Sequence, residues 1–103
     1  MALFIIAEIG SNHMNSLAVA ETLIAAAQSA GADAVKFQAL SERSWQSPAD
    51  WERRQPFSVS SDFLRHCADY AQSTGAEFLC TPFHPDDVGW RNPLVRRGER
   101  GPA

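Results

Sequence analysis

Three short apolar runs, each followed by a polar stretch that contains glycine or proline, recur along the first 82 residues of the chain. They occupy residues 3–7, 34–38 and 77–81 and contain β-branched and aromatic side chains. Runs of this length and content are typical of strands that are buried on both faces, and such strands belong to parallel sheets. We therefore predict three parallel β-strands, the first of them buried on both faces.

Two longer segments between these runs carry apolar residues at helical spacing. Residues 17–30 and residues 62–74 each combine an apolar stripe with a polar face. Gly31 and Gly75 follow the two segments and suit the left-handed position that ends a helix. The candidate N-caps are Asn15 or Ser16 for the first helix and Ser60 or Ser61 for the second. The pattern predicts the order strand, helix, strand, helix, strand.

The segments that connect these elements complete the predicted topology. Residues 41–58 contain Trp45, Trp51 and two prolines without a sustained period, so we predict a long aromatic-rich loop at the end where the strands exit. Pro85 suits the first turn of a further helix. Strict alternation of strands and helices predicts an α/β fold with right-handed crossovers, in a closed barrel or an open doubly wound sheet.

Length and composition restrict these possibilities. The chain has 103 residues, of which 45% are hydrophobic and 20% charged, as in an ordinary globular protein. An eight-stranded β/α barrel needs roughly 250 residues. We therefore predict a βαβαβ fragment of a partial TIM (β/α)8 barrel within residues 1–90. Residues 91–103 hold four arginines and one glutamate, in contrast to the acidic balance before them, and we interpret this irregular Arg- and Gly-rich tail as truncated or out-of-frame sequence.

Charge and cysteine content argue against several classes of protein. The net charge of -3 offers no electrostatic basis for binding nucleic acid. Glu8 interrupts the first apolar run and no basic segment precedes it, so we expect neither secretion nor membrane insertion, and a cytoplasmic location. Cys67 and Cys80 lack CxxC spacing, and we expect both to be reduced core residues. Three histidines lack the spacing of metal ligands: His13, His66 and His84.

Polar side chains at the ends of the strands are the candidates for catalytic or binding groups. Because side chains alternate along a strand, Lys36 and Gln38 share one face of the second strand while Val35 and Phe37 share the other. If Phe37 packs under the helices, Lys36 points into the barrel, where an ammonium group costs several kcal/mol unless an anion compensates it.

The other two strands also end in polar residues. Glu8 closes the first strand and Thr81 closes the third. In β/α barrels the carboxyl ends of the strands carry the catalytic groups. We therefore predict that Glu8, Lys36, Gln38 and Thr81 belong to one site.

Three segments that carry these residues also resemble a known family. They read FIIAEIGSNH at residues 4–13, AGADAVKFQ at residues 30–38 and FLCTPF at residues 78–83. In this order and spacing they closely resemble the amino-terminal barrel of the sialic acid synthase family, which includes N-acetylneuraminate synthases and their legionaminate and pseudaminate relatives. The resemblance covers about residues 3–88 and implies a transferase of sialic acid biosynthesis.

The resemblance implies a reaction and a role for each candidate residue. Phosphoenolpyruvate condenses with an N-acetylated amino sugar of the N-acetylmannosamine type, and inorganic phosphate is released. Lys36 and Thr81 would hold the carboxylate of phosphoenolpyruvate, and Gln38 would face the sugar. Glu8 would lie beside the reacting carbons, where it either stabilises positive charge at C2 or orients the attacking water. The resemblance also implies a homodimer and a divalent metal, Mn or Mg, whose histidine ligands come from later strands that this chain lacks.

The chain departs from the family pattern at two places besides its tail. His13 is followed by Met14 and Asn15 where the family usually has Asn and Gly, and the segment between the second strand and the second helix is shorter than usual. The first difference could reposition the loop after the first strand. The second leaves the sugar preference open.

Simpler interpretations stay open for each candidate residue. Lys36 could reach solvent from a strand edge, Glu8 could cap a neighbouring backbone, and Thr81 could end its strand for packing reasons. Trp45 and Trp51 could line a substrate mouth or merely cover the barrel rim. Two other functions also remain: another phosphoenolpyruvate-dependent deoxy-sugar-acid synthase, and a non-catalytic interaction fragment with bare sheet edges.

Overall fold

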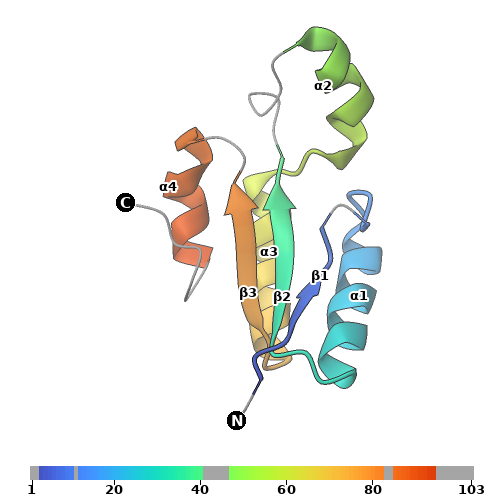
Figure 1. Ribbon diagram of the computed structural model, residues 1–103, viewed down its shortest axis with the longest axis vertical. Helices are drawn as coiled ribbons and strands as arrows, with labels where there is room; N and C mark the ends of the chain where they lie inside the picture. Colours follow the sequence, from blue (N-terminus) through green and yellow to red (C-terminus); the bar gives the residue numbers. More distant parts are fainter. Residues whose placement is uncertain (1–2, 11, 41–46, 83–84, 95–103) are drawn as a thin grey trace.

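A three-stranded parallel sheet, with strand order β1-β2-β3, forms the centre of the computed structural model (Figure 1). The structure describes residues 3–10, 12–40, 47–82 and 85–94. The strands are β1 (Ile6–Glu8), β2 (Ala34–Ala39) and β3 (Glu77–Pro82). The helical elements are α1 (Leu17–Ser29), α2 (Pro48–Arg54), η2 (Gln55–Phe57), α3 (Ser61–Ser73), η3 (Pro85–Asp87), α4 (Val88–Arg91) and η4 (Asn92–Leu94). This alternation confirms the predicted α/β class.

Hydroxyl caps determine where the two long helices begin. The side-chain oxygen of Ser16 accepts a hydrogen bond from the backbone N–H of Val19, at 3.2 Å. Ser60 accepts in the same way from Phe63, at 3.1 Å. These bonds satisfy N–H groups that have no partner within the helix, and they settle the two choices of N-cap that the sequence left open. Gly31 and Gly75 follow the helices at φ values of 98° and 91°, as predicted.

The hydrophobic core lies between the sheet and the helices α1 and α3. Val35 and Phe78 are register partners on β2 and β3, and both are buried. The rings of Phe37 and Phe78 stack with their centroids 5.4 Å apart. Ile24 from α1 and Leu64 from α3 cover them. Val35 and Phe37 of β2 therefore face the helices, and the residues that alternate with them lie on the opposite face of the sheet.

The first strand corrects one prediction. It begins only at Ile6, and the apolar residues before it are not buried: Leu3 is 77% exposed and Ile5 is 51% exposed. Within the described residues β1 pairs with β2 alone, so it is an edge strand. An apolar run is buried on both faces only where neighbouring elements cover it, and here this cover is lacking.

The connection between β2 and α3 differs from the predicted long loop. Instead of a continuous loop it contains α2 and η2, which lie beyond the ends of the strands (Figure 1). Ser47 caps α2 by accepting from the N–H of Asp50, and Pro48 occupies the first turn, where its missing N–H costs nothing. Asp50 also pairs with Arg53 one turn later. Trp51 lies within α2, whereas Trp45 lies outside the described residues.

The segment after β3 is helical, as Pro85 predicted. The turn η3 leads into α4, which lies beside β3 (Figure 1), and Leu94 in η4 packs against the core. Arg91 is also buried. His84 and residues 95–103 lie outside the described part of the chain, so the division of the chain at residue 90 stays a prediction.

Both cysteines are buried and neither forms a disulfide, as expected. Burial, assisted by the negative charge of Glu21, raises the pKa of the Cys67 thiol to about 12. This thiol is therefore protonated at neutral pH and is a packing group. Among the described helices, none has the length and apolar character needed to cross a bilayer.

Candidate functional site

The sheet register brings the four predicted site residues together on the face opposite the core. Glu8 of β1 is the register partner of Lys36 of β2, and Gln38 of β2 is the register partner of Thr81 of β3. Neighbouring residues in a parallel register point to the same face. The four residues thus form two successive rows across the sheet, near the ends where the strands exit.

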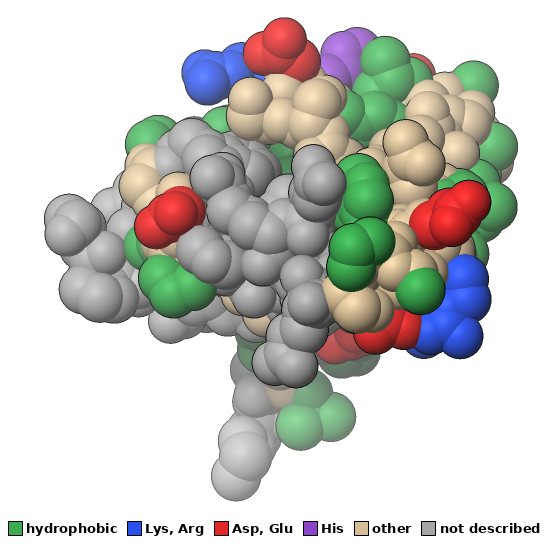
Figure 2. Space-filling model, turned by 90° about the horizontal axis from the view of Figure 1, so that it is seen from above, with side chains coloured by type: hydrophobic (Ala, Val, Ile, Leu, Met, Phe, Trp, Pro, Cys, Tyr) green, Lys and Arg blue, Asp and Glu red, His purple; other side chains and the backbone are tan. Residues whose placement is uncertain are grey.

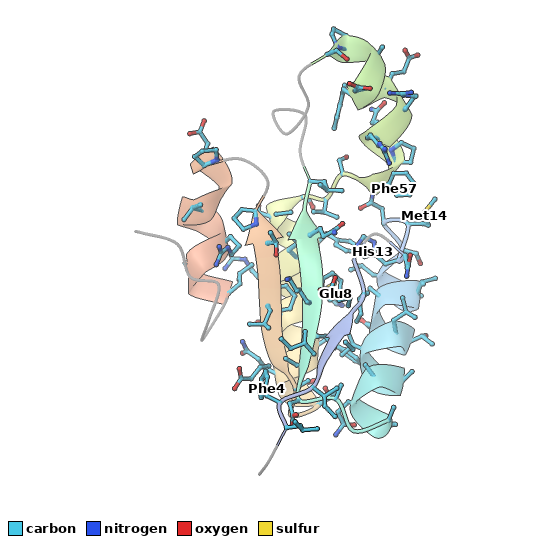
Figure 3. The ribbon with its side chains drawn as sticks, viewed as in Figure 1. Phe4, Glu8, His13, Met14 and Phe57 are labelled. Atoms are coloured by element: carbon cyan, nitrogen blue, oxygen red, sulfur yellow. The ribbon has the colours of Figure 1, made fainter. Side chains whose placement is uncertain are left out.

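Lys36 and Glu8 form an ion pair. The distance from Lys36 Nζ to Glu8 Oε1 is 3.6 Å, and the two side chains are 26% and 66% exposed. Figure 3 shows Glu8 beside β2. The ammonium group is therefore neither in bulk solvent nor far from the carboxylate. Since 3.6 Å exceeds hydrogen-bond length, the pair is loose, and a second anion can approach the ammonium without breaking a short bond to Glu8.

The loop after β1 lies next to Gln38. Gly10 has a φ of 51°, and a Cβ atom added there would lie 3.9 Å from both Cδ and Oε1 of Gln38. The backbone N–H groups of Ile9 and Gly10 both donate to the carbonyl oxygen of Lys36, at 2.9 and 3.2 Å. This loop is therefore fastened to the residue that carries the ammonium group and lies close to the next polar side chain on that face.

Thr81 lies in the second row. It is partly buried, and its register partner is Gln38, whereas the register partner of Lys36 is Leu79. Thr81 and Lys36 therefore belong to adjacent strands but to successive rows. A ligand that contacts both must span one step along the sheet, and a carboxylate with two oxygens suits this geometry.

His13 is a buried residue near this site to which the sequence assigned no role. Its side chain is 1% exposed, and its ring lies 5.6 Å from that of Phe37 and 4.8 Å from that of Phe63. Burial lowers the pKa of His13, while the backbone of Gly10 acts in the opposite direction. Periodicity does not reveal a residue of this kind, because it lies in a loop.

Among the residues that the structure describes, the remaining polar groups do not assemble into a metal centre. In the described ranges, no three His, Cys, Asp or Glu side chains are close enough together to hold a metal ion. His66 instead pairs with Glu21 across α1 and α3, at 2.6 Å. Seen from the end where the strands exit, the described charges of both signs are spread around the periphery (Figure 2).

Several known proteins resemble this chain in sequence. The model of the NeuB family matches residues 23–95. The N,N'-diacetyllegionaminic acid synthase of Legionella pneumophila is 31% identical over 104 residues, which covers 85% of this chain and 29% of that protein. The human N-acetylneuraminate-9-phosphate synthase is 36% identical over 93 residues, with coverages of 76% and 26%.

A solved structure is similar to this chain in its fold as well as in its sequence. The N-acetylneuraminic acid synthetase of Leptospira borgpetersenii, in complex with citrate, has a TM-score of 0.82 at 28% identity and covers 91% of this chain and 34% of its own. The chain thus spans about a quarter to a third of the length of these relatives. Its three parallel strands and helices match part of the barrel of the Leptospira structure. The match of the family model over most of the sequence shows that the chain belongs to the NeuB family.

Proposed function

We propose that this chain supplies the first three strands of a synthase that joins phosphoenolpyruvate to an N-acetylated amino sugar of the N-acetylmannosamine type. The products are a sialic acid-like nonulosonic acid and inorganic phosphate. Membership of the NeuB family supports the reaction class. The observation that carries the proposal is the Glu8–Lys36 pair on the face of the sheet opposite Phe37 and Phe78, within one row of Gln38 and Thr81.

In this proposal Lys36 and Thr81 bind the carboxylate of phosphoenolpyruvate. The side chain of Lys36 is 26% exposed, so it is only partly hydrated and still reaches the surface of the sheet. A hydroxyl donates one hydrogen bond, and a carboxylate accepts it in addition to the charge-assisted contact from Lys36. Charge-assisted contacts of this kind contribute about 1.5–3 kcal/mol.

Glu8 then acts at the reacting carbons. C3 of phosphoenolpyruvate forms a new bond to the aldehyde carbon of the open-chain sugar, which leaves positive charge at C2. Water adds to C2 and gives one proton to the former aldehyde oxygen, which becomes a hydroxyl group. The bond between C2 and the phosphate oxygen then breaks, C2 becomes a ketone, and the second proton leaves with the phosphate. The carboxylate of Glu8 stabilises the charge at C2 or orients the water, and both roles fit a carboxylate beside the carboxylate-binding ammonium.

Gln38 provides the contact to the sugar. Its side chain combines a donor with an acceptor, as hydroxyl and acetamido groups require. It stands one row beyond the Glu8–Lys36 pair and next to Gly10. The sugar would therefore enter over the loop that follows β1.

The rest of the site would come from later strands of the family barrel. The resemblance assigns to them the phosphate contacts, most sugar contacts and the histidines that hold Mn or Mg. The described residues offer no matching cluster, and none of the roles given to Glu8, Lys36, Gln38 and Thr81 depends on the metal. We expect the 103-residue chain by itself to bind phosphoenolpyruvate weakly and not to convert it. The homodimer of the resembling family belongs to the same proposal.

Lys36 is the only lysine of the chain, which makes the proposal directly testable. Reductive methylation with ¹³C-formaldehyde keeps the charge and gives one lysine signal besides that of the amino terminus. Phosphoenolpyruvate should shift this signal in a saturable titration, and glycerol 3-phosphate should shift it less because it has no carboxylate. Equal shifts, or none at all, would contradict the proposed carboxylate contact.

Substitutions complete the experiment. Lys36→Met should weaken phosphoenolpyruvate binding by at least roughly tenfold, as followed by the shifts of backbone amides. Arg65→Met removes one positive charge from the exposed surface of α3 and is the matched control, with affinity unchanged. The class of the acceptor sugar is tested with an intact relative. Release of phosphate from phosphoenolpyruvate in the presence of N-acetylmannosamine, but not of arabinose 5-phosphate, would support an N-acetylated amino sugar as the acceptor.

A further inference from the structure

Several backbone hydrogen bonds hold the described residues of the loop between β1 and α1. The first of them are those that Ile9 and Gly10 donate to the carbonyl of Lys36. The N–H of Asn12 then donates to the carbonyl of Ile9, at 3.1 Å, and the N–H of Ser16 to that of His13, at 2.9 Å. Ser16 in turn caps α1. These bonds connect the described part of the loop to β2 at one end and to α1 at the other.

His13 occupies the centre of this loop. Its Nδ1 accepts a hydrogen bond from the backbone N–H of Asn15, at 2.9 Å. Met14 and Asn15 have φ values of 51° and 61°, in the left-handed region that side chains with a Cβ rarely adopt. Two consecutive residues in this region cost energy, and the bond to His13 helps to offset it.

The imidazole ring also contacts the strand that carries the site. It stacks on Phe37, which lies between Lys36 and Gln38 in the sequence and faces the core. On its other side it packs against Phe63 of α3. A displacement of the ring would therefore be transmitted to the backbone of β2 at the two residues that face the proposed substrates.

The same loop is joined to the connection that follows β2. Asn15 Nδ2 donates to the carbonyl oxygen of Pro56 in η2, at 2.8 Å. Figure 3 shows His13 above α1, with Met14 near Phe57. These two segments are 41 positions apart in sequence and meet at the end of the sheet where the strands exit. Asn15 thus connects the loop after β1 to η2.

Packing between Phe37 and Phe63 does not by itself require a histidine at position 13, because a phenyl ring would fill the same space. Nε2 is buried without a hydrogen bond of good geometry to a described residue, although the backbone of Gly10 favours the protonated ring. What histidine adds over phenylalanine is the acceptor at Nδ1, which is used for Asn15.

We propose that His13 is a positioning residue whose neutral imidazole, with Nδ1 as acceptor and the proton on Nε2, locks the loop after β1 beside Gln38 and against Pro56. The loop thereby forms the sugar-side wall of the site, a role that rests on the proposed function. The position of the loop does not depend on that function, because the hydrogen bonds that hold it are present without a ligand.

The test uses the full chain labelled with ¹⁵N. Long-range ¹H–¹⁵N spectra should show His13 with an unprotonated Nδ1 and a protonated Nε2, and the amide of Asn15 should be protected from hydrogen exchange. A proton on Nδ1 of His13 at neutral pH would overturn the proposal, whatever the variants do. This measurement requires only the unsubstituted chain.

Two substitutions separate the acceptor from the ring. His13→Phe keeps a ring and removes the acceptor, so exchange of the Asn15 amide should accelerate at least tenfold and the side-chain amide signals of Gln38 should shift. His13→Asn places an oxygen near the position of Nδ1 and should retain part of the protection. Protection and Gln38 signals that are unchanged in His13→Phe would overturn the proposal.

Further controls keep the outcomes distinct. His66→Phe, on the exposed side of α3, should leave the Asn15 amide and Gln38 unchanged. If His13→Phe fails to fold while His13→Asn folds with Asn15 protected, the acceptor is the essential feature and the proposal stands. Failure of phosphoenolpyruvate to shift the Lys36 signal would refute the proposed function and leave the assignment of His13 intact.

Discussion

The ion pair between Lys36 and Glu8 contributes little to the stability of the fold. Glu8 is 66% exposed and its carboxylate lies 3.6 Å from the ammonium. Exposed pairs of this kind contribute about 0–1 kcal/mol to folding. The pair therefore matters for the charge that a ligand meets. An approaching carboxylate is attracted by Lys36 and repelled by Glu8, so the two residues influence its binding in opposite directions.

Glu8→Gln should therefore strengthen the binding of phosphoenolpyruvate to the chain while leaving its stability almost unchanged. The expected gain is about two- to fivefold, which corresponds to ~0.5–1 kcal/mol for an exposed charge contact. The titration of the methylated Lys36 signal measures it. Glu52→Gln on the exposed surface of α2 is the control with the same change in net charge. Weaker binding by Glu8→Gln would show that the carboxylate supports the ligand instead of repelling it.

The burial of His13 should make stability depend on pH. Its pKa is lowered below the ordinary value of 6.5, so the unfolded chain binds more protons than the folded chain between the two values. The free energy of unfolding should fall as the pH decreases from above 6.5 to the lowered pKa, and this contribution should then level off. The flanking rings of Phe37 and Phe63 carry no charge that would oppose this effect.

Urea denaturation at a series of pH values measures this dependence. In His13→Phe the free energy of unfolding should no longer fall as the pH decreases just below 6.5, whereas in His66→Phe this fall should remain. If the pH dependence disappears in His66→Phe and remains in His13→Phe, then His13 is not its cause.

At the scale of the elements, the N-caps explain why the helices begin where they do. Ser60 accepts from Phe63, whereas Ser61 is the first residue of α3 and is exposed. Ser60→Ala should therefore lower the free energy of unfolding by about 1 kcal/mol. Ser61→Ala, the matched control, should change it by less than about 0.5 kcal/mol. Equal effects in urea denaturation would show that the cap adds nothing specific.

The sequence predicted those elements whose pattern is local and repeated. The parity of Lys36, Gln38 and Phe37 along β2 was enough to place them on opposite faces, because alternation follows from the strand backbone alone. α2 was missed, although Ser47 and Pro48 are good start signals, since seven residues carry too short a pattern. His13 was missed because its partners Phe37 and Phe63 are distant in sequence, and no local pattern encodes such contacts.

At the scale of the whole molecule, the start of the first strand leaves apolar surface uncovered. Ile6 and the apolar residues just before it are exposed, with Leu3 at 77% and Ile6 at 43%. Within the described residues only β2 pairs with it. An edge of this composition offers backbone groups and apolar surface to any other strand. In the relatives, which are three to four times longer, the barrel has more strands to cover it.

We therefore expect the 103-residue chain to self-associate through the edge of β1. Ile6→Lys places a charge on this edge and should reduce the association, because pairing with a second strand would then desolvate an ammonium group. Val19→Lys is the matched control, since Val19 is 42% exposed on α1 against 43% for Ile6 on the strand. Sedimentation velocity over a range of concentrations measures the effect. If the two variants lower the average mass equally, association depends on general surface hydrophobicity, and the edge of β1 has no special part in it.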